Sequence, residues 1–364
     1  MIKNCYIHIP FCNTICSYCD FCKQFYDKKK VNIYLFKLKE EVFNNYKNEL
    51  LDTIYIGGGT PTSLDILELK ELFSITDNLN KNNNIEFTME ANYESITKEK
   101  LDLMVSHGVN RISIGLESTN KDNLKFLNRE FNRDKFTNTI KMIRDVGINN
   151  INIDLIYGLP IENMDILKAD LDYIISLNVE HIFTYSLIIE DHTILGINNT
   201  SSIDEELDKE MYEFIISYLK KHNYKHYEIS NFCKDNYYSR HNMCYWNNLE
   251  YYGFGLGAAS YIDNIRKTNT RSINNYPYKY LEVEELDINE KIEYEILLNL
   301  RLIDGIDLNV FKSKYNIDLK DVYDYSELVN NKLLILKDSH LRIPEEYLYV
   351  SNEIIVKFLQ TRKD

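Results

Sequence analysis

Residues 6–22 read YIHIPFCNTICSYCDFC, and this stretch decides the fold class. Its first residues are typical of a buried strand. Cys12, Cys16 and Cys19 follow with the spacing C-x3-C-x2-C, so three thiolates can converge in one loop on a 4Fe-4S cluster. Three protein ligands leave one of the four irons open. The amino and carboxylate groups of S-adenosylmethionine (SAM) can chelate that iron, and radical chemistry then belongs to the cofactor.

Two simpler interpretations of these cysteines stay open. The thiols could be a zinc site or buried free thiols, although zinc normally needs a fourth ligand. Cys22 could supply one, but a fourth thiolate would also close the open iron of a cluster. We therefore expect Cys22 to be an inert small apolar residue or to lie behind the ligands.

Composition excludes several classes of protein. The net charge of −14 disfavours nucleic acid as a partner, because phosphate binding needs a basic face. Seven cysteines, four of them between Cys12 and Cys22, do not form a disulfide framework and instead indicate metal or redox chemistry in a reducing compartment. No apolar stretch is long enough to cross a bilayer, and the first residues do not read as a signal peptide. We expect a cytoplasmic protein.

Short β-rich runs alternate with amphipathic helical stretches from Cys5 to about Glu190, which predicts an α/β fold of repeated βα units around a parallel sheet. Six units predict a partial (β/α)6 barrel, whose chemistry lies at the carboxyl ends of the strands. The predicted strands are Cys5–Ile9, Thr53–Ile56, Ile85–Glu90, Arg111–Leu116, Asn152–Ile156 and His181–Ile188. The predicted helices between them are Lys37–Tyr46, Asp65–Asp77, Lys98–Ser106, Lys135–Val146 and Ile166–Ser176.

Three parts are predicted along the chain. Residues 1–225 form the barrel, 226–288 an aromatic connecting segment that looks like a site, and 289–364 a small C-terminal domain. The last part contains helices and then a hairpin that turns at Asp338 and Ser339, so we expect an α-rich, winged-helix-like fold.

Several blocks together resemble one known group. Tyr6 to Cys12, Cys19 to Phe21, Gly57 to Pro61, Asp154 to Pro160 and Tyr227 to Phe232 resemble the radical-SAM group that contains oxygen-independent coproporphyrinogen III dehydrogenases and HemW-type haem chaperones. The resemblance covers nearly the whole chain. Taken jointly these motifs are highly specific.

The resemblance implies a set of SAM contacts. Glycines let the backbone approach the methionine amino group, Glu90 accepts a hydrogen bond from its ammonium, Arg129 meets its carboxylate and Asp154 takes the ribose hydroxyls. Taken singly, a glycine run is often only a turn and a charged strand end is often only solvated. The full set of implied SAM-contact residues is Tyr6, Tyr18, Gly58, Gly59, Thr60, Glu90, Glu117, Arg129 and Asp154.

Two positions depart from the group's pattern. Glu117 stands where the group usually has Gln, and Leu127 to Phe131 lacks the Gly and His that often flank the group's Arg. A carboxylate at 117 beside Glu90 would repel the carboxylate of SAM unless it is protonated, so we expect weakened SAM binding.

Three features favour the chaperone branch over the dehydrogenase branch. Dehydrogenases carry a fourth Cys two positions after the third, where this chain has Phe21. They also carry a substantial N-terminal extension, whereas five residues precede Tyr6. The third feature is the run from His241 to Trp246, HNMCYW, which matches the H-N-x-x-Y-W motif associated with haem binding in chaperones.

The haem motif offers an axial ligand and a packing surface. An imidazole suits haem iron, so His241 is the expected ligand, with Tyr245 and Trp246 against the macrocycle. Alone, His241 would more often be a structural histidine, and Cys244 could compete as a thiolate ligand. Ala259 stands where the group often has His, so one secondary contact is missing.

These observations predict a HemW-type haem chaperone with a 4Fe-4S cluster, SAM and haem, and with no catalytic residue for porphyrinogen decarboxylation. The expected partners are haem, haem-requiring recipient proteins that include membrane-bound ones, and an electron donor such as a flavodoxin or ferredoxin. A homodimer is left open. The alternatives are an oxygen-independent coproporphyrinogen III dehydrogenase and a radical-SAM enzyme or degenerate relative with another role.

Overall fold

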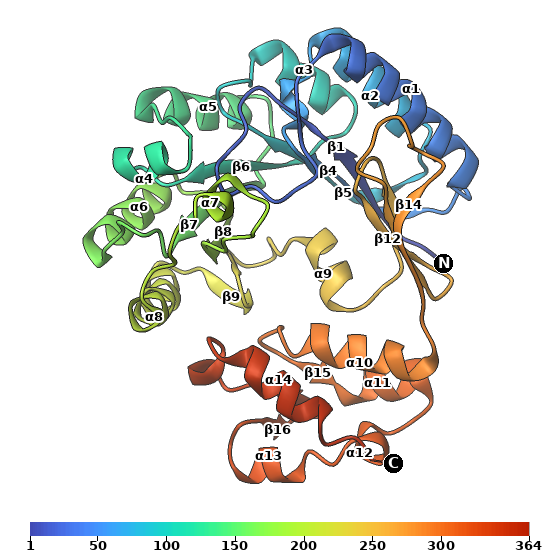
Figure 1. Cartoon of the computed structure of the whole chain (residues 1–364), viewed down its shortest axis with the longest axis vertical. Coiled ribbons are helices and arrows are strands. Elements are labelled where there is room, and N and C mark those ends of the chain that lie inside the picture. The colour runs from blue at the N-terminus through green and yellow to red at the C-terminus, as the bar shows by residue number, and fades with distance from the viewer. Residues whose placement is uncertain (364) are drawn as a thin grey trace.

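The computed structural model describes residues 1–363 and is built around one long curved sheet (Figure 1). Within these residues nine strands form it in the order β11-β1-β4-β5-β6-β7-β8-β10-β9. Neighbours from β11 to β8 run parallel, whereas β10 is antiparallel to both β8 and β9. The strands are β1 (Asn4–Ile9), β4 (Leu51–Gly58), β5 (Lys81–Ala91), β6 (Arg111–Glu117), β7 (Ile151–Tyr157), β8 (His181–Ser186), β9 (Lys225–Glu228), β10 (Asn231–Cys233) and β11 (Tyr252–Phe254).

All six strands predicted from the sequence are present, so the predicted α/β class is confirmed. The strands are buried on both faces. In β7, six of the seven residues are buried, which is the expected result of covering a parallel sheet on both sides.

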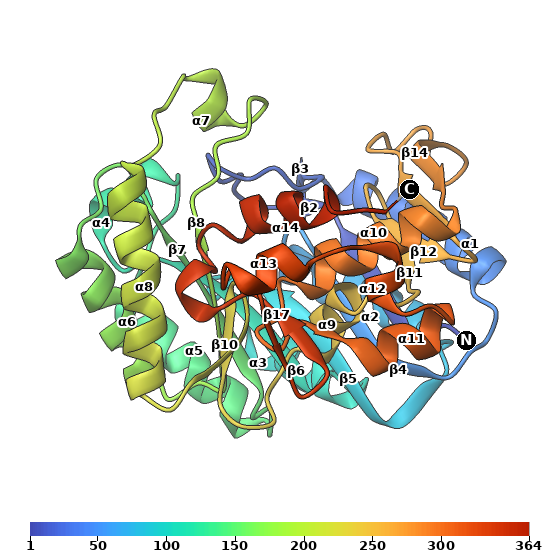
Figure 2. The ribbon, with the colours of Figure 1, turned by 90° about the horizontal axis from the view of Figure 1, so that it is seen from below.

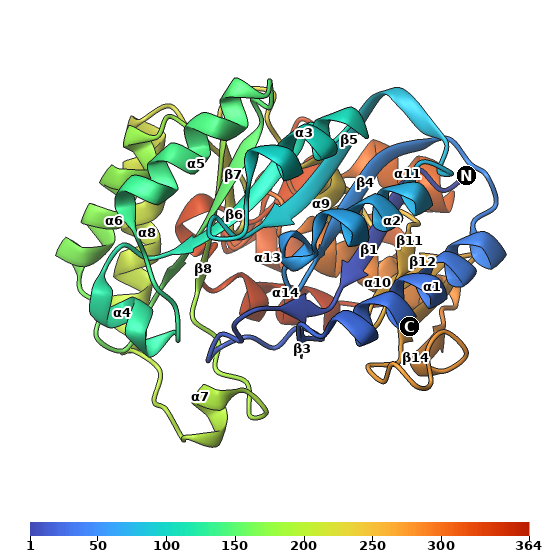
Figure 3. The ribbon, with the colours of Figure 1, turned by 90° about the horizontal axis from the view of Figure 1, so that it is seen from above.

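Helices cover the outer face of the sheet (Figure 3). Asp65 begins α2 through a capping box, in which its side chain accepts from the Glu68 amide and Glu68 accepts from the Asp65 amide. The helices of this part are α1 (Lys28–Asn45), α2 (Ile66–Thr76), α3 (Lys98–Ser106), α4 (Lys121–Phe126), α5 (Arg133–Asp145), α6 (Met164–Ser176), α7 (Ile194–Ile197) and α8 (Glu205–Lys221).

The segment 226–288 contributes to the main sheet. It supplies β10 and β11, and β11 pairs with β1 through Cys5 and Tyr252. It also holds α9 (Arg240–Trp246) and a three-stranded antiparallel sheet of β12 (Ala259–Ile262), β13 (Ile265–Asn269) and β14 (Tyr280–Glu285). The predicted three-part division of the chain stays a prediction.

The C-terminal part combines helices with a small sheet, as the sequence predicts. The predicted hairpin turn is present, because Asp338 and Ser339 both have positive φ, as a two-residue hairpin turn of the primed type requires. Its elements are α10 (Ile288–Asn299), β15 (Ile306–Asp307), α11 (Leu308–Tyr315), α12 (Leu319–Val322), α13 (Ser326–Asn330), β16 (Ile335–Lys337), β17 (His340–Arg342) and α14 (Ser351–Leu359).

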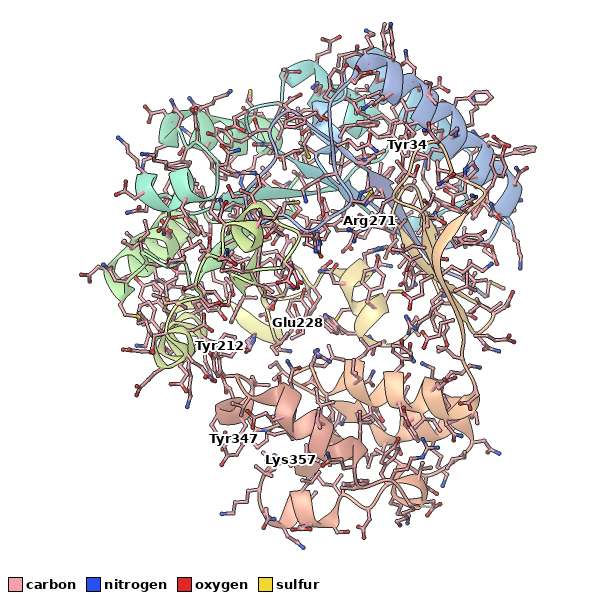
Figure 4. The ribbon with its side chains drawn as sticks, in the orientation of Figure 1. Tyr34, Tyr212, Glu228, Arg271, Tyr347 and Lys357 are labelled. Carbon is pink, nitrogen blue, oxygen red and sulfur yellow. The ribbon has the colours of Figure 1, made fainter. Side chains whose placement is uncertain are left out.

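The C-terminal part docks beside α9, where it lies across the concave side of the sheet (Figure 2). Two backbone hydrogen bonds of 3.1 Å join it to the strand end at β9, from Ile229 N to Arg301 O and from Ile303 N to Tyr227 O. Glu228 lies at this junction and is fully buried (Figure 4). Across residues 1–363, no helix combines the length and the hydropathy that crossing a bilayer requires.

Candidate functional site

A cavity of about 1170 Å³ lies at the carboxyl ends of the parallel strands, on the concave side of the sheet. This volume is slightly above the range usual for small-molecule sites. The cavity brings together most of the predicted site. Its lining includes Cys12, Cys16, Tyr18, Cys19, Gly58, Gly59, Thr60, Glu90, Glu117, Arg129 and Asp154, but not Tyr6, His241, Tyr245 or Trp246.

The cysteine loop is held on two sides by backbone contacts. Ser17 donates its amide to the Leu127 carbonyl at 3.1 Å, and its own carbonyl accepts from the Leu195 amide at 3.1 Å. The Asn128 side chain donates to the Ile15 carbonyl at 2.9 Å. The loop is therefore fixed between the end of α4 and α7 before any ligand binds.

The three thiols open on the same cavity. Cys12 Sγ accepts from the Thr60 hydroxyl at 3.8 Å, and burial raises the pKa of the Cys12 thiol to about 11. Among residues 1–363, no three His, Cys, Asp or Glu side chains stand close enough together to hold a single metal ion. A cluster takes each thiolate on a separate iron, so three dispersed thiols fit a cluster better than one zinc ion.

The glycine run shapes the wall beside Cys12. A Cβ at Gly59 would lie 2.8 Å from Cys12 Sγ, and Gly58 has φ +119, in the region that only glycine adopts readily. A side chain at Gly59 would fill the space next to the thiol, whereas one at Gly58 would meet the His8 ring. The wall thus fits a bulky group on Cys12.

Glu90 is held by two donors. Its Oε1 accepts from the Tyr55 hydroxyl at 2.8 Å and its Oε2 from the Gly58 amide at 2.9 Å. Desolvation raises the pKa of Glu90 to about 6, against the lowering effect of these hydrogen bonds. A cationic group in the cavity would favour the charged carboxylate.

Arg129 and Glu117 form an ion pair inside the cavity. Arg129 NH1 lies 3.5 Å from Glu117 Oε1, and NH2 donates to the Gly115 carbonyl at 2.9 Å. Arg129 also lies 3.8 Å from Cys16 Sγ. Glu117 Oε2 is buried with no hydrogen-bond partner, so this carboxylate has an unused acceptor. The guanidinium predicted to meet a ligand carboxylate is therefore shared with Glu117.

Asp154 lies deeper, on β7. Its Oδ1 accepts from Asn152 Nδ2 at 2.6 Å and from the Ser113 hydroxyl at 3.5 Å. Burial, with Glu117 and Glu90 close by, raises the pKa of Asp154 well above its ordinary value. This side chain can thus accept from hydroxyl groups either as a carboxylate or, when protonated, through its remaining lone pairs.

The structure does not present His241 as an open ligand. The residue is buried, its Nδ1 lies 2.7 Å from the Thr53 hydroxyl and its Nε2 lies 2.7 Å from the Tyr245 hydroxyl. Burial, assisted by the charge of Arg111, lowers the pKa of His241 to about 3, so the ring is neutral. Ligation of iron would need one of these hydrogen bonds to break.

Of the motif, Asn242 lines the cavity, whereas Trp246 and the cysteines other than Cys12, Cys16 and Cys19 lie outside the lining. Trp246 is half-buried, and its carbonyl accepts from Asn299 of α10 at 2.7 Å. Cys22 packs in the main core against Gly257, as expected of an inert residue. Cys244 is buried and donates to the Leu249 carbonyl at 3.8 Å.

Sequence reasoning missed one functional candidate, Arg111. It begins β6 and lines the cavity, although it is only 2% exposed. Side chains two residues apart share a face of a strand, so Arg111 and Ser113 both face inward with Glu117 further along. The strand was predicted to begin at Arg111, so the alternation of its side chains could have shown that Arg111 faces the same side as Ser113.

Two family models match the chain. The Radical SAM superfamily matches residues 6–174, and the HemN C-terminal domain matches residues 286–346. The haem chaperone HemW of Lactococcus lactis is 36% identical over 98% of this chain and 97% of its own length. The chain belongs to the HemW family of radical-SAM proteins. The haem chaperone HemW of Bacillus subtilis is 34% identical, over 98% of this HemW-family chain and 99% of its own length.

A solved structure supports the fold of this HemW-family chain. Coproporphyrinogen III oxidase (HemN) from Escherichia coli, a radical-SAM enzyme, aligns with a TM-score of 0.86 over 98% of this chain and 90% of that chain. At 18% identity the likeness shows the fold alone. The resemblance and the radical-SAM barrel with a C-terminal domain, both predicted from the sequence, are confirmed.

Proposed function

We propose that this HemW-family chain is a haem chaperone that holds a 4Fe-4S cluster, binds SAM and haem, and passes haem to haem-requiring proteins. One observation carries the proposal: three thiols, two guanidiniums and seven carboxyl groups line one cavity, which Asn242 of the haem-motif helix α9 also lines. The HemW relatives named as haem chaperones align with almost the whole chain, which supports the same role.

Cys12, Cys16 and Cys19 would hold the cluster. The loop is already fixed on both sides, and the glycines beside Cys12 leave room for a group on its sulfur. When bound, the cluster would supply a single electron and one open iron for SAM. No residue of the cavity is assigned a catalytic role in porphyrinogen decarboxylation, so SAM would serve assembly or regulation.

The cavity would hold SAM by matching charges. Glu90 would accept from the ammonium, Arg129 would donate to the carboxylate and Asp154 would accept from the ribose hydroxyls. Gly58, Gly59 and Thr60 would bring the backbone close. Tyr18 would cover the adenine or the cluster edge, and Glu117 would compete with SAM for Arg129. Tyr6 would approach the methionine part of SAM from outside the cavity lining; its hydroxyl now lies 2.9 Å from His8 Nδ1.

Haem would bind at the motif on α9. His241 is the proposed axial ligand through Nε2, which must first release the Tyr245 hydroxyl, while Tyr245 and Trp246 would pack on the macrocycle. Haem-requiring proteins would receive the haem, and a flavodoxin or ferredoxin would reduce the cluster. The neighbouring C-terminal part, which touches α9 through Asn299, is a suitable place for a recipient to influence release.

Anaerobic reconstitution with iron and sulfide, followed by haem titration and transfer to a haem-free recipient enzyme, tests the proposal. We expect about four irons per chain, a Soret band that saturates, and recipient activity that depends on the loaded chain. An incubation with coproporphyrinogen III and a reductant is the counter-test. Substantial protoporphyrinogen formation would replace the chaperone assignment with the dehydrogenase alternative.

A further inference from the structure

Arg111 is a buried cation to which the protein offers no partner. Its side chain is 2% exposed, and among residues 1–363 no atom lies within hydrogen-bond or ion-pair distance of its guanidinium. Its Nε is fully buried and unpaired. Burying an arginine without a counter-charge is costly, so proteins nearly always pair such a group.

Most of the acceptors around Arg111 already accept from other donors, although Asp154 Oδ2 does not. Asp154 Oδ1 accepts from Asn152, and Asn152 Oδ1 lies 2.5 Å from His181 Nδ1. Both oxygens of Glu90 accept from other donors, the Tyr55 hydroxyl and the Gly58 amide. Arg111 thus makes no hydrogen bond or ion pair with these side chains, although its charge lowers the pKa of both Glu90 and Asp154, and it lines the cavity with its Nε unpaired.

Arg111 lies far from the place proposed for the SAM carboxylate. It is the first residue of β6, whereas Glu117, the ion-pair partner of Arg129, is the last. At about 3.3 Å per residue the two backbone positions are roughly 20 Å apart. The two guanidiniums therefore belong to opposite ends of the strand, and an anion on Arg111 need not be the group that Arg129 binds.

The same cavity also offers an aromatic surface, which lies further along the strands, level with Gly115 and Glu117. Phe183 and Tyr185 project from β8 into the lining, and their rings stack with centroids 5.0 Å apart. A flat apolar ring system with a carboxylate at its edge would satisfy both this surface and Arg111. Room remains for it, because the cavity is larger than a single small ligand usually occupies.

We infer that Arg111 binds a carboxylate of a second ligand, which shares the cavity with SAM and enters it beside α9, whose Asn242 lines the same cavity. Within the proposed haem-chaperone function, on which this inference rests, that carboxylate is a propionate of the tetrapyrrole. The other source of the same chemistry is the carboxylate of SAM itself. The two sources predict different responses to removal of the charge.

The experiment compares haem with its dimethyl ester, which lacks the propionate charges, on anaerobically reconstituted protein. We expect wild type to bind haem about 10- to 100-fold more tightly than the ester, as a desolvated charged hydrogen bond implies. R111Q should lose that preference and bind both alike. R111K should keep part of it, and R362Q, which removes an exposed arginine, should behave as wild type.

SAM binding to the same variants separates the two sources. Unchanged SAM affinity in R111Q, together with the lost preference for haem over its ester, supports the inference. A fall in SAM affinity with unchanged haem affinity assigns Arg111 to SAM and overturns it. Equal affinity of the wild type for haem and the ester also overturns the inference, and this test does not depend on any variant folding. A wild type that binds neither haem nor the ester contradicts the proposed function as well.

Discussion

The cluster end of the cavity and the haem-motif helix α9 were both predicted as binding sites, yet the structure presents them differently. Around Cys12, Cys16 and Cys19 the loop is fixed by contacts at its flanks, and the thiols face open space. On α9 the ligand candidate His241 is buried with both ring nitrogens hydrogen-bonded. The cluster end can therefore take a ligand without breaking a contact. On α9, His241 must first lose one of its internal hydrogen bonds before it can bind a ligand.

This difference has a physical origin. A thiol is a weak hydrogen-bond partner, so a protein can leave it facing a cavity at small cost, whereas a buried imidazole must be satisfied. The sequence of a histidine-containing binding motif therefore does not indicate whether the ring is free to bind a ligand or is already hydrogen-bonded within the protein. Variants at each region can show whether the contrast persists when ligands are present.

The largest effect is expected at the cluster end. C16S should lower the iron content after reconstitution from about four per chain to near zero, because a hydroxyl is a poor replacement for a thiolate that ligates a cluster iron. Iron and sulfide analysis with the near-ultraviolet and visible spectrum measures it. C22S is the matched control and should retain the cluster, since Cys22 packs in the core. Loss of iron in C22S but not in C16S would reverse the assignment of the ligands.

The next effect tests whether α9 is internally closed. H241A leaves the Tyr245 hydroxyl without this partner, leaves the Thr53 hydroxyl with Asn4 Oδ1 alone and opens a buried cavity, so the free energy of unfolding should fall by about 2–4 kcal/mol. Urea unfolding of the protein without haem measures this loss. A change below about 0.5 kcal/mol, the range of ordinary surface substitutions, would mean that the internal hydrogen bonds do not hold the ring.

Y245F sharpens the same comparison with a smaller change. It removes the hydroxyl that occupies Nε2 and leaves the ring of His241 in place. If His241 is the axial ligand, the affinity for haem should rise about 2- to 10-fold, which corresponds to one hydrogen bond no longer broken on binding. Haem titration against wild type and H241A measures it. An affinity that falls in Y245F would favour packing by the tyrosine over ligation by His241.

The cluster end of the cavity could be predicted from the sequence, whereas the state of the haem-motif helix could not. Strand periodicity predicted the six strands from β1 to β8, and the cysteine spacing predicted the loop that lines the cavity. The three- and four-residue strands β9, β10 and β11 were missed, because so few residues show no period. The state of His241 on α9 could not be predicted, since its partner Thr53 lies on β4, 188 positions away in the chain. Arg111 was missed although its strand was predicted.

The junction under α9 provides a pH-dependent test. Burial raises the pKa of Glu228 from 4.5 to about 7, so the folded protein binds this proton more tightly than the unfolded chain. Its contribution to stability is full below pH 4.5 and is lost as the pH rises through about 7. The loss amounts to at most about 3 kcal/mol.

E228Q should remove that pH dependence. The amide cannot ionise, and Asn231, whose Oδ1 has no partner, can turn to accept from it. Urea unfolding should give similar stabilities for variant and wild type at pH 4.5, and a variant more stable by about 1–3 kcal/mol at pH 8. Glu41, whose pKa burial also raises to about 7, leaves part of the slope in both proteins. A constant difference at all pH values would contradict the raised pKa.

The smallest effect concerns the competition inside the cavity. Glu117 shares Arg129 with any ligand carboxylate, and its own charge repels such a group. E117Q keeps the shape but removes the ion pair, so SAM should bind several-fold more tightly to the reconstituted protein, as expected for relief of an interaction worth about 1 kcal/mol. Anaerobic titration calorimetry measures it, and E210Q on the exposed face of α8 is the control of equal charge. Weaker SAM binding in E117Q would mean instead that Glu117 positions the Arg129 guanidinium for the ligand. The ion pair would then assist SAM binding at the cluster end of the cavity instead of competing with it.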